Sequence, residues 1–341
     1  MSACANTTSA LLTTDYGWDR GTDGNLNGMS SFKFEGQRIA YTEFGGGPAA
    51  VTAAGGRGRT AKSAPANTRP LIIVHGVLLS QEMHRPLAKA LAARGNRVIT
   101  VDLLGHGQSD RPRDMWRYSM GILAQQLIAL MDHLQIEQAV VMGTSLGANT
   151  ALEIASVAPE RLRGMVIEMP VLDNALLWSA LFFTPQLVAL TFGEPAMRLI
   201  ARGARAVPRW LLPHYANVTL DLIRQEPGPS GALLQGLFFG RIAPHRNERR
   251  TFHVPALVLG HRRDPIHPFS DAGMLADELP NGRLLEADSL VELRMHPERL
   301  TGEIASFLDE VWSPQSARSV PRPKRPSKRT GVASRTGAAS G

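Results

Sequence analysis

Cysteine is almost absent from this chain of 341 residues, because Cys4 is the only one. A single cysteine excludes an intrachain disulfide framework, which suits a reducing compartment, and we expect a cytoplasmic protein. The sequence also has no Cys/His cluster with metal-ligand spacing and no phosphate-binding glycine loop, so neither a metal nor an organic cofactor is expected. The N-terminus lacks a basic segment followed by an apolar core, and we therefore expect no signal peptide.

Acidic residues are missing from residues 313–341, which contain seven Lys or Arg. The net charge of the whole chain is +7, so +7 − 7 leaves the rest of the chain with a net charge of zero. The basic character therefore belongs to a Ser/Pro/Arg-rich tail that we expect to be disordered. For this reason we expect no specific nucleic-acid partner.

A long unbroken hydrophobic run is missing as well. The most apolar stretch, residues 175–192, is interrupted by Thr184-Pro185-Gln186. Such an interruption does not favour a membrane span, and we expect buried or lid helices there instead.

What the chain does have is a repeating pattern of apolar strands and amphipathic helices. Residues 31–45 come first and alternate around Glu35-Gly36-Gln37, which predicts a β-hairpin. The alternation that follows predicts an α/β fold with a mostly parallel sheet and helices on both faces. Strands are expected at residues 71–74, 97–103, 139–142, 162–168, 256–259 and 283–286, and helices at 83–94, 119–134, 148–157, 270–279 and 300–311.

The pattern also divides the chain into segments. Between residues 171 and 250 the sequence is helical, apolar and punctuated by proline, and we expect an inserted helical cap. The α/β core is then formed by residues 31–170 and 251–312, with a Gly/Ala/Arg-rich surface loop at 45–70. Residues 1–30 are rich in Ser, Thr, Asn and Gly and are expected to be disordered.

The clearest chemical signature is Gly143-Thr144-Ser145-Leu146-Gly147, which stands between an apolar strand and a helical pattern. A Gly-x-Ser-x-Gly at such a junction is typical of a nucleophile elbow, a tight turn that lifts the serine hydroxyl above the sheet edge. Ser145 is therefore the candidate nucleophile. The amide of Leu146, at the start of the helix, is a candidate donor to an oxyanion.

Three other segments follow predicted strands. In His75-Gly76-Val77 the glycine lets the backbone turn, so that the amide of Val77 becomes a second candidate oxyanion donor. The Asp102–Asp110 loop contains Asp, His and Ser side chains, which we expect to brace the loop by hydrogen bonds to the backbone. Asp264 lies just past another strand, where a carboxylate can orient a histidine.

Taken in chain order, these segments resemble the α/β-hydrolase superfamily from Ser31 to Trp312. The motifs that carry the resemblance are His75-Gly76, the Asp102–Asp110 loop, the elbow and Gly260-x-x-x-Asp264. The resemblance implies a core with a helical cap and the family order of nucleophile, acid and histidine, with Ser145 as nucleophile and Asp264 as acid. A serine at the elbow argues against haloalkane dehalogenases and epoxide hydrolases, which place an aspartate there.

The family histidine is not at its usual place, which is just after the last strand and several residues before the proline that opens the final helix. Residues 285–295 contain no histidine. Three alternatives are open. His296, directly before Pro297, could be the base if its loop is rearranged; His267, three residues after Asp264, could enter from the loop of the acid; or no ordinary triad exists.

We therefore expect an esterase-like serine hydrolase that acts on a small to medium apolar ester or a related acyl compound, because the cap is rich in Leu, Phe and Trp. The missing histidine keeps a second alternative open, a catalytically impaired protein of this fold that binds a ligand or regulates. An acyltransferase or a haloperoxidase-like activity would begin with the same serine chemistry. A small apolar substrate is the expected partner, and the oligomeric state is left open.

Overall fold

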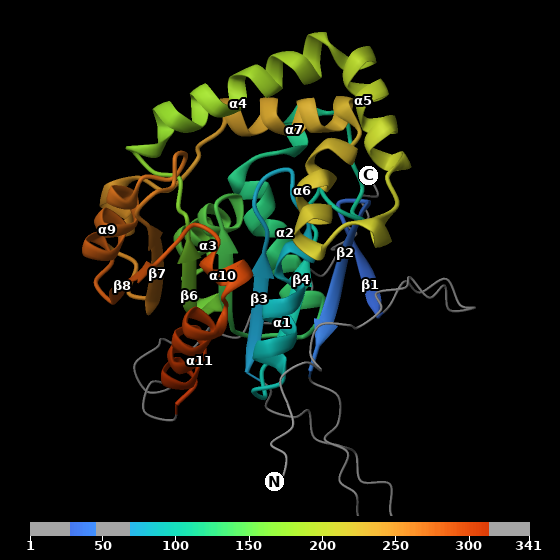
Figure 1. The fold of residues 1–341 in the computed structure, drawn as a ribbon. Helices are drawn as coiled ribbons and strands as arrows, with labels where there is room; N and C mark the ends of the chain where they lie inside the picture. The colour runs from blue at the N-terminus through green and yellow to red at the C-terminus, as the bar shows by residue number, and fades with distance from the viewer. Residues whose placement is uncertain (1–27, 46–68, 314–341) are drawn as a thin grey trace, which may run out of the picture.

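The computed structural model describes residues 28–45 and 69–313 (Figure 1). The predictions of disorder for residues 1–30 and 313–341, and of a surface loop at 45–70, therefore fall almost entirely outside the described residues. At the N-terminus one boundary is wrong. Met29 and Ser30 already belong to the first strand, because they pair with Thr42 and Tyr41 of the second.

The centre of the fold is one eight-stranded sheet in the order β1-β2-β4-β3-β5-β6-β7-β8. The hairpin β1–β2 and the pair β2–β4 are antiparallel, and every other pair is parallel. The predicted α/β fold with a mostly parallel, open sheet is confirmed. The strands are β1 (Met29–Phe34), β2 (Gln37–Phe44), β3 (Pro70–Val74), β4 (Arg97–Val101), β5 (Ala139–Thr144), β6 (Leu162–Glu168), β7 (Ala256–His261) and β8 (Gly282–Ala287).

Helices cover both faces of the sheet, because alternate strand residues point to opposite sides and both sides are apolar. On β3, Ile72 and Val74 pack with α2, α3 and α9, whereas Leu71 and Ile73 pack with α1 and α11. The core helices are α1 (Arg85–Ala92), α2 (Met120–His133), α3 (Leu146–Val157), α9 (Phe269–Glu278), α10 (Glu292–Met295) and α11 (Glu298–Val311). At the start of α2 the Ser119 hydroxyl accepts from the amide of Ile122 and caps the helix.

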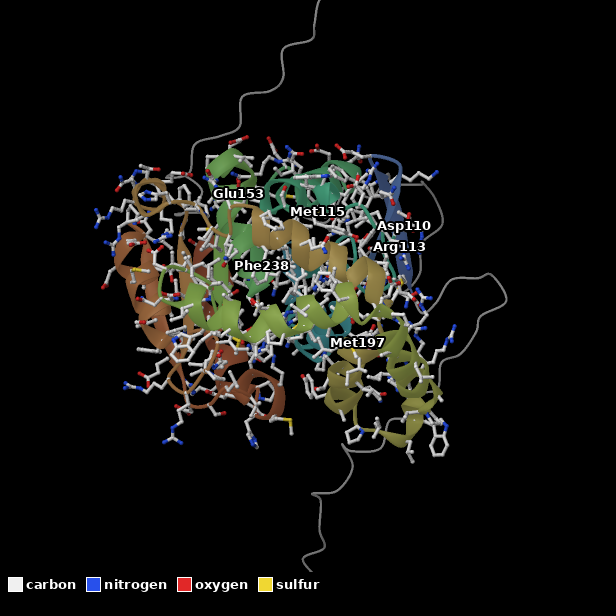
Figure 2. The ribbon with its side chains drawn as sticks, turned by 90° about the horizontal axis from the view of Figure 1, so that it is seen from above. Asp110, Arg113, Met115, Glu153, Met197 and Phe238 are labelled. Carbon is white, nitrogen blue, oxygen red and sulfur yellow. The ribbon has the colours of Figure 1, made fainter. Side chains whose placement is uncertain are left out.

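Between β6 and β7 the described chain forms helices that lie over the carboxyl ends of the strands (Figure 1). Seen from above, α4 and α7 run side by side, and Leu190 of α4 lies against Gly231 of α7 (Figure 2). The helices of this region are α4 (Ala175–Phe192), α5 (Glu194–Ala206), α6 (His214–Arg224), α7 (Pro227–Phe239) and α8 (Arg246–Arg249). Short 3-10 turns are η1 (Gln81–His84), η2 (Met115–Arg117), η3 (Pro159–Arg161) and η4 (Arg209–Leu211).

The apolar stretch 175–192 differs from its prediction. Thr184-Pro185-Gln186 does not interrupt it, and the segment forms one continuous helix, α4, with Pro185 inside. Pro185 costs one helical hydrogen bond. It lies on the exposed side of the helix together with Leu181, four residues earlier, so its ring displaces no core side chain.

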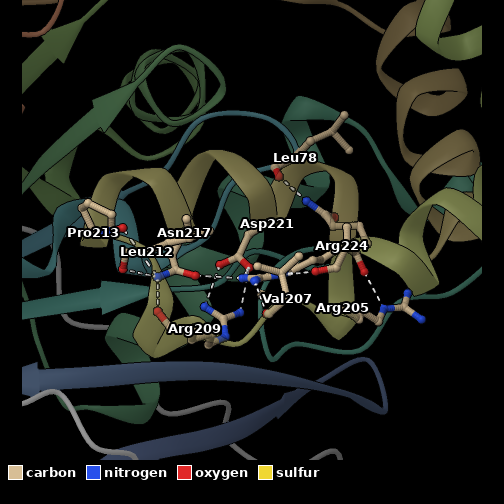
Figure 3. Close-up of polar contacts among 12 residues, drawn as sticks. Leu78, Arg205, Val207, Arg209, Leu212, Pro213, Asn217, Asp221 and Arg224 are labelled. Carbon is tan, nitrogen blue, oxygen red and sulfur yellow. Dashed lines mark hydrogen bonds and ion pairs between the residues drawn. The ribbon is translucent and has the colours of Figure 1, made fainter.

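A polar network joins α5 and α6 (Figure 3). The guanidinium of Arg224 donates to the carbonyls of Ala204 at 3.0 Å and Val207 at 2.8 Å, and to the side chain of Asn217 at 3.1 Å. The next residue, Gln225, donates from its side chain to the carbonyl of Leu78, in the loop after β3. The Gln225 contact attaches the end of α6 to the loop that carries one of the candidate oxyanion donors.

Candidate active site

The nucleophile elbow has the geometry that its sequence predicts. Ser145 joins β5 to α3 with φ 53° and ψ −107°, a strained conformation for a residue with a side chain. The two glycines permit the turn: a Cβ on Gly143 would lie 2.1 Å from the backbone of Gly147, and one on Gly147 would lie 2.4 Å from the carbonyl oxygen of Val74. The helix can therefore approach the sheet closely enough to raise Ser145 at its edge.

The structure distinguishes between the two candidate bases, His267 and His296. Ring nitrogen Nε2 of His267 lies 3.0 Å from Oγ of Ser145, and Nδ1 lies 2.9 Å from Oδ2 of Asp264. His296 instead follows α10 with its side chain exposed, and in the described part of the chain it makes no hydrogen bond to Ser145 or Asp264. The structure thus brings together Ser145, His267 and Asp264, and it places His296 elsewhere.

The physical reason for this choice lies in the loop between β7 and α9. Oδ1 of Asp264 accepts from the amides of Ile266 at 2.8 Å and His267 at 2.9 Å, which folds the loop back on itself. The ring of His267 then returns over the carboxylate and reaches Ser145. His296 follows α10, where its amide donates to the carbonyl of Glu292, and its side chain is exposed.

The electrostatics of Asp264 suit an orienting carboxylate. Burial acts to raise the pKa of Asp264, but the hydrogen bonds from the ring of His267 and from the amides of Ile266 and His267 outweigh burial and hold the pKa below its usual value. The carboxylate is therefore charged at neutral pH, where it can stabilise a positively charged imidazole.

Both candidate oxyanion donors lie at the same place. Leu146 is the first residue of α3, so its amide has no carbonyl one turn earlier in the helix to bond. Val77 lines the cavity beside Ser145, and a Cβ on the preceding Gly76 would lie 3.8 Å from Cβ of Ser145. Leu78 follows with φ 58°, so this loop, like the elbow, contains a strained residue.

The other polar residues after β3 and β4 hold loops, as the sequence predicts. Asp102 accepts from the amides of Gln81 at 2.7 Å and Gln108 at 2.8 Å. The His75 ring lies between the carbonyl of Gly76 and the amide of Leu103, at 2.8 Å and 3.1 Å. The hydroxyl of Ser109 accepts from the amide of Ala40 at 2.8 Å. These side chains fix the loops around the site and do not reach Ser145.

Ser145 and Phe183 line two apolar cavities that both lie beneath α4, one under each half of the helix. The larger has a volume of about 780 Å³ and is lined by Asp264, His267 and apolar side chains of α4, α5 and α6. The smaller, of about 270 Å³, lies between α4 and α7 and is lined by Leu146 and Leu234 among others. The site therefore offers apolar space in two cavities that both reach Ser145.

A buried ion pair beneath the elbow is a functional feature that the sequence analysis missed. Glu168, at the end of β6, accepts from the guanidinium of Arg294, with one contact at 2.8 Å, and from the hydroxyl of Thr144 at 2.5 Å. Its backbone carbonyl accepts from the amide of Ser145 at 2.9 Å. Glu168 is thus bonded to Ser145 through its backbone and to the preceding residue, Thr144, through its side chain.

Two signals in the sequence point to this pair. Glu168 is the one acid of β6 and follows the apolar run Met165-Val166-Ile167, and Arg294 lies in the segment where the superfamily usually carries its histidine. Burial acts to raise the pKa of Glu168, but Arg294 and His261 more than offset it and hold the pKa well below its usual range. The carboxylate is therefore charged and paired.

His84 lies next to this pair and makes stability depend on pH. Its Nε2 lies 3.3 Å from the hydroxyl of Thr144, and burial, with the charge of Arg294, lowers its pKa to about 3. In the unfolded chain the pKa of histidine is about 6.5. Between these values the unfolded state binds more protons, so the free energy of unfolding falls as pH falls from about 6.5 towards 3.

We expect the variant His84→Gln to lose this dependence. One such histidine contributes at most about 1.4 kcal/mol per pH unit, so the stability of the variant relative to wild type should rise by about 2 kcal/mol between pH 7 and pH 5. Urea unfolding at pH 7, 6 and 5 measures it. The exposed His253→Gln is the matched control, and an equal gain in that variant would show that His84 is not the cause.

Among the described residues no group of three His, Cys, Asp or Glu side chains is placed to hold a metal ion. The chemistry that the arrangement itself supports is nucleophilic attack by Ser145, with proton transfer through the His267 ring and charge stabilisation by Asp264.

The chain is similar to known proteins in sequence and in fold. A family model described as alpha/beta hydrolase fold matches residues 69–289. The AB hydrolase superfamily protein YisY of Bacillus subtilis (strain 168) is 28% identical over 228 residues, which cover 63% of this chain and 80% of that protein. The 3-oxoadipate enol-lactonase 2 of Acinetobacter baylyi (strain ATCC 33305 / BD413 / ADP1) is 29% identical over 205 residues, which cover 57% of this chain and 72% of that protein.

Solved structures give the same fold. The enol-lactonase from Burkholderia xenovorans LB400 superimposes with a TM-score of 0.62 at 21% sequence identity, and the match covers 82% of this chain and 99% of that one.

Proposed function

Because this chain belongs to the α/β-hydrolase family, we propose that it is a serine hydrolase that cleaves esters or related acyl compounds with apolar groups. The relatives with a named activity are hydrolases of this fold, which supports the reaction class. One observation carries the proposal: His267 lies within hydrogen-bond distance of both Ser145 and Asp264.

In the proposed reaction Oγ of Ser145 attacks the carbonyl carbon while Nε2 of His267 accepts the hydroxyl proton. The oxygen that becomes negative is stabilised by the amides of Val77 and Leu146, each worth about 2.7–4 kcal/mol in comparable sites. His267 then gives its proton to the leaving alcohol, and an acyl-enzyme remains. Water, deprotonated by the same ring, attacks the acyl-enzyme and releases the acid and the free serine.

The cavities support a neutral, apolar substrate. Most of the side chains that line them are aliphatic or aromatic. Within the described residues the larger cavity offers one cationic side chain, Arg294, and Glu168 already pairs with it. A lactone would follow the same steps as a linear ester. For a lactone that bears a carboxylate, however, the described lining of this cavity offers no unpaired Lys or Arg side chain.

A fluorophosphonate probe tests the activated serine. Wild-type protein is expected to be labelled at pH 7–8, and Ser145→Ala should abolish the labelling, because the probe reacts with a serine whose proton a base removes. Ser230 is the matched control: it lines the same cavity, but in the described chain no histidine contacts its hydroxyl. Ser230→Ala should retain the label. An unlabelled wild type, or a label that persists in Ser145→Ala, would refute the proposal.

A further inference from the structure

The outer side of α4 is an apolar surface with no partner in the described chain. We call Leu177, Trp178, Leu181, Val188 and Phe192 the cap face; their exposed fractions range from 49% to 82%. The helix has 18 residues and no charged side chain, and only 6% of it is buried. In a soluble protein a helix of this composition is normally buried, so the cap face is a strong indication of an apolar partner.

The inner side of α4 belongs to the fold. Phe183, Leu187 and Leu190 pack against the main hydrophobic core. Among the described residues α4 is the one helix long and apolar enough to cross a membrane, but a crossing would remove these three side chains from their contacts. A partner must therefore contact only the outer side of α4, with the helix axis parallel to the surface of the partner.

The cap face continues into the mouth of the larger cavity. Its rim is formed by exposed apolar side chains from four parts of the chain: Phe182 of α4, Ile200 of α5, Ile223 of α6, and Val291 and Met295 at α10. Cavity rims exposed to water are usually polar. The rim of the cavity and the cap face form one continuous apolar region, and this fits a single partner surface that contacts both.

The charge beside the cap face selects the partner. The helix that follows, α5, carries Arg198, Arg202 and Arg205. Arg205 pairs with Glu226 at 2.8 Å, whereas Arg202 is exposed and forms no ion pair within the described residues. The acid between α4 and α5, Glu194, is already paired with Arg113 and Arg198. Arginines at the border of an apolar helix suit anionic lipid headgroups, since their stems lie along the apolar surface and their charges reach the phosphates.

A second copy of the chain fits this arrangement less well. In a twofold dimer about the middle of the cap face, the arginines of α5 would lie opposite the amino-terminal half of α4 in the other copy, which has no acidic side chain to pair with them. We propose that the cap face docks on the surface of an anionic lipid bilayer, with α4 parallel to the membrane and the mouth of the cavity turned towards the lipid.

The single cysteine of the chain makes a direct test possible. In the background Cys4→Ser, one variant carries Leu181→Cys on the cap face, and its matched control carries Val157→Cys, which is 54% exposed at the end of α3 remote from Ser145. Both are labelled with the fluorophore NBD and mixed with vesicles of phosphatidylcholine and phosphatidylglycerol (1:1) or of phosphatidylcholine alone. The probe at 181 should shift to the blue with the anionic vesicles, less with the neutral ones, and the probe at 157 should not shift.

Other outcomes would overturn the proposal. Sedimentation with anionic vesicles without a shift at 181 would mean that the seven basic residues of 313–341 attach the chain. A shift at 181 that grows with protein concentration and needs no vesicles would identify a second copy as the partner. No shift at all, or equal shifts at 181 and 157, would also refute it.

Introducing negative charges on the cap face gives an independent measurement. Leu177→Glu with Leu181→Glu should weaken vesicle binding at least about tenfold, because two exposed apolar side chains are replaced by charges that anionic lipid repels. The control Val157→Glu should leave binding within about twofold. Since binding is measured without substrate, this experiment is independent of whether the proposed hydrolysis occurs.

Discussion

Replacing His267 by glutamine is expected to lower kcat by about 10⁴-fold to 10⁶-fold, the loss usual for the base of a serine triad. Glutamine retains a polar group near Ser145 but cannot accept the proton and return it to the leaving group. Hydrolysis of p-nitrophenyl butyrate at pH 8 measures the effect. Urea unfolding should show a change of less than about 1 kcal/mol, since the ring is at the edge of a cavity and not in the core.

His296→Gln is the matched variant. The side chain is exposed and remote from the hydroxyl in the structure, so kcat should stay within about twofold of wild type. A large loss in His296→Gln with near-normal activity in His267→Gln would mean that the loop after β8 rearranges and that His296 is the base. Equal retention of activity in both variants would show that the reaction does not use a histidine base.

The second large effect concerns stability. Replacing Arg294 by methionine leaves the buried carboxylate of Glu168 without its main partner, and we expect the free energy of unfolding to fall by about 3–5 kcal/mol. The matched control is the exposed pair Arg283 and Glu310, whose contact is 3.2 Å long. Arg283→Met should change stability by less than about 1 kcal/mol. Urea unfolding at pH 7 measures both.

The double variant Arg294→Met with Glu168→Leu separates pairing from burial. Removing both charges leaves none unpaired, so it should be more stable than Arg294→Met alone by about 1–4 kcal/mol. If the single and double variants were equally unstable, packing of the arginine stem would be the important contribution. If neither lost stability, the pair would be unimportant to the fold.

Much of the core could be predicted because its signals are local. The strand β6 was predicted with its observed bounds, and the turn between β1 and β2 lies at the predicted Glu35-Gly36. The continuity of α4 could not be predicted in the same way. A proline costs one hydrogen bond, and whether a helix tolerates this depends on packing along its other side, which only the folded cap supplies.

The site, like the fold, could be predicted only in part from the sequence. Gly143 and Gly147 flank Ser145 in five consecutive residues, so the sequence alone indicates the elbow. The return of His267 over Asp264 depends on two backbone hydrogen bonds in the loop, and a spacing of three residues does not reveal them. Arg294 and Thr144 are 150 residues apart, and no local pattern relates them.

The placement of Asp264 and His267 on one short loop has a kinetic consequence. A single opening of the segment between β7 and α9 disconnects the carboxylate and the imidazole from Ser145 in one event, whereas acid and base on separate loops would be lost one at a time. Local openings of loops require less free energy than global unfolding. Activity in dilute urea should therefore disappear in one reversible step before the sheet unfolds, and amide exchange at Ile266 and His267 should report the same step.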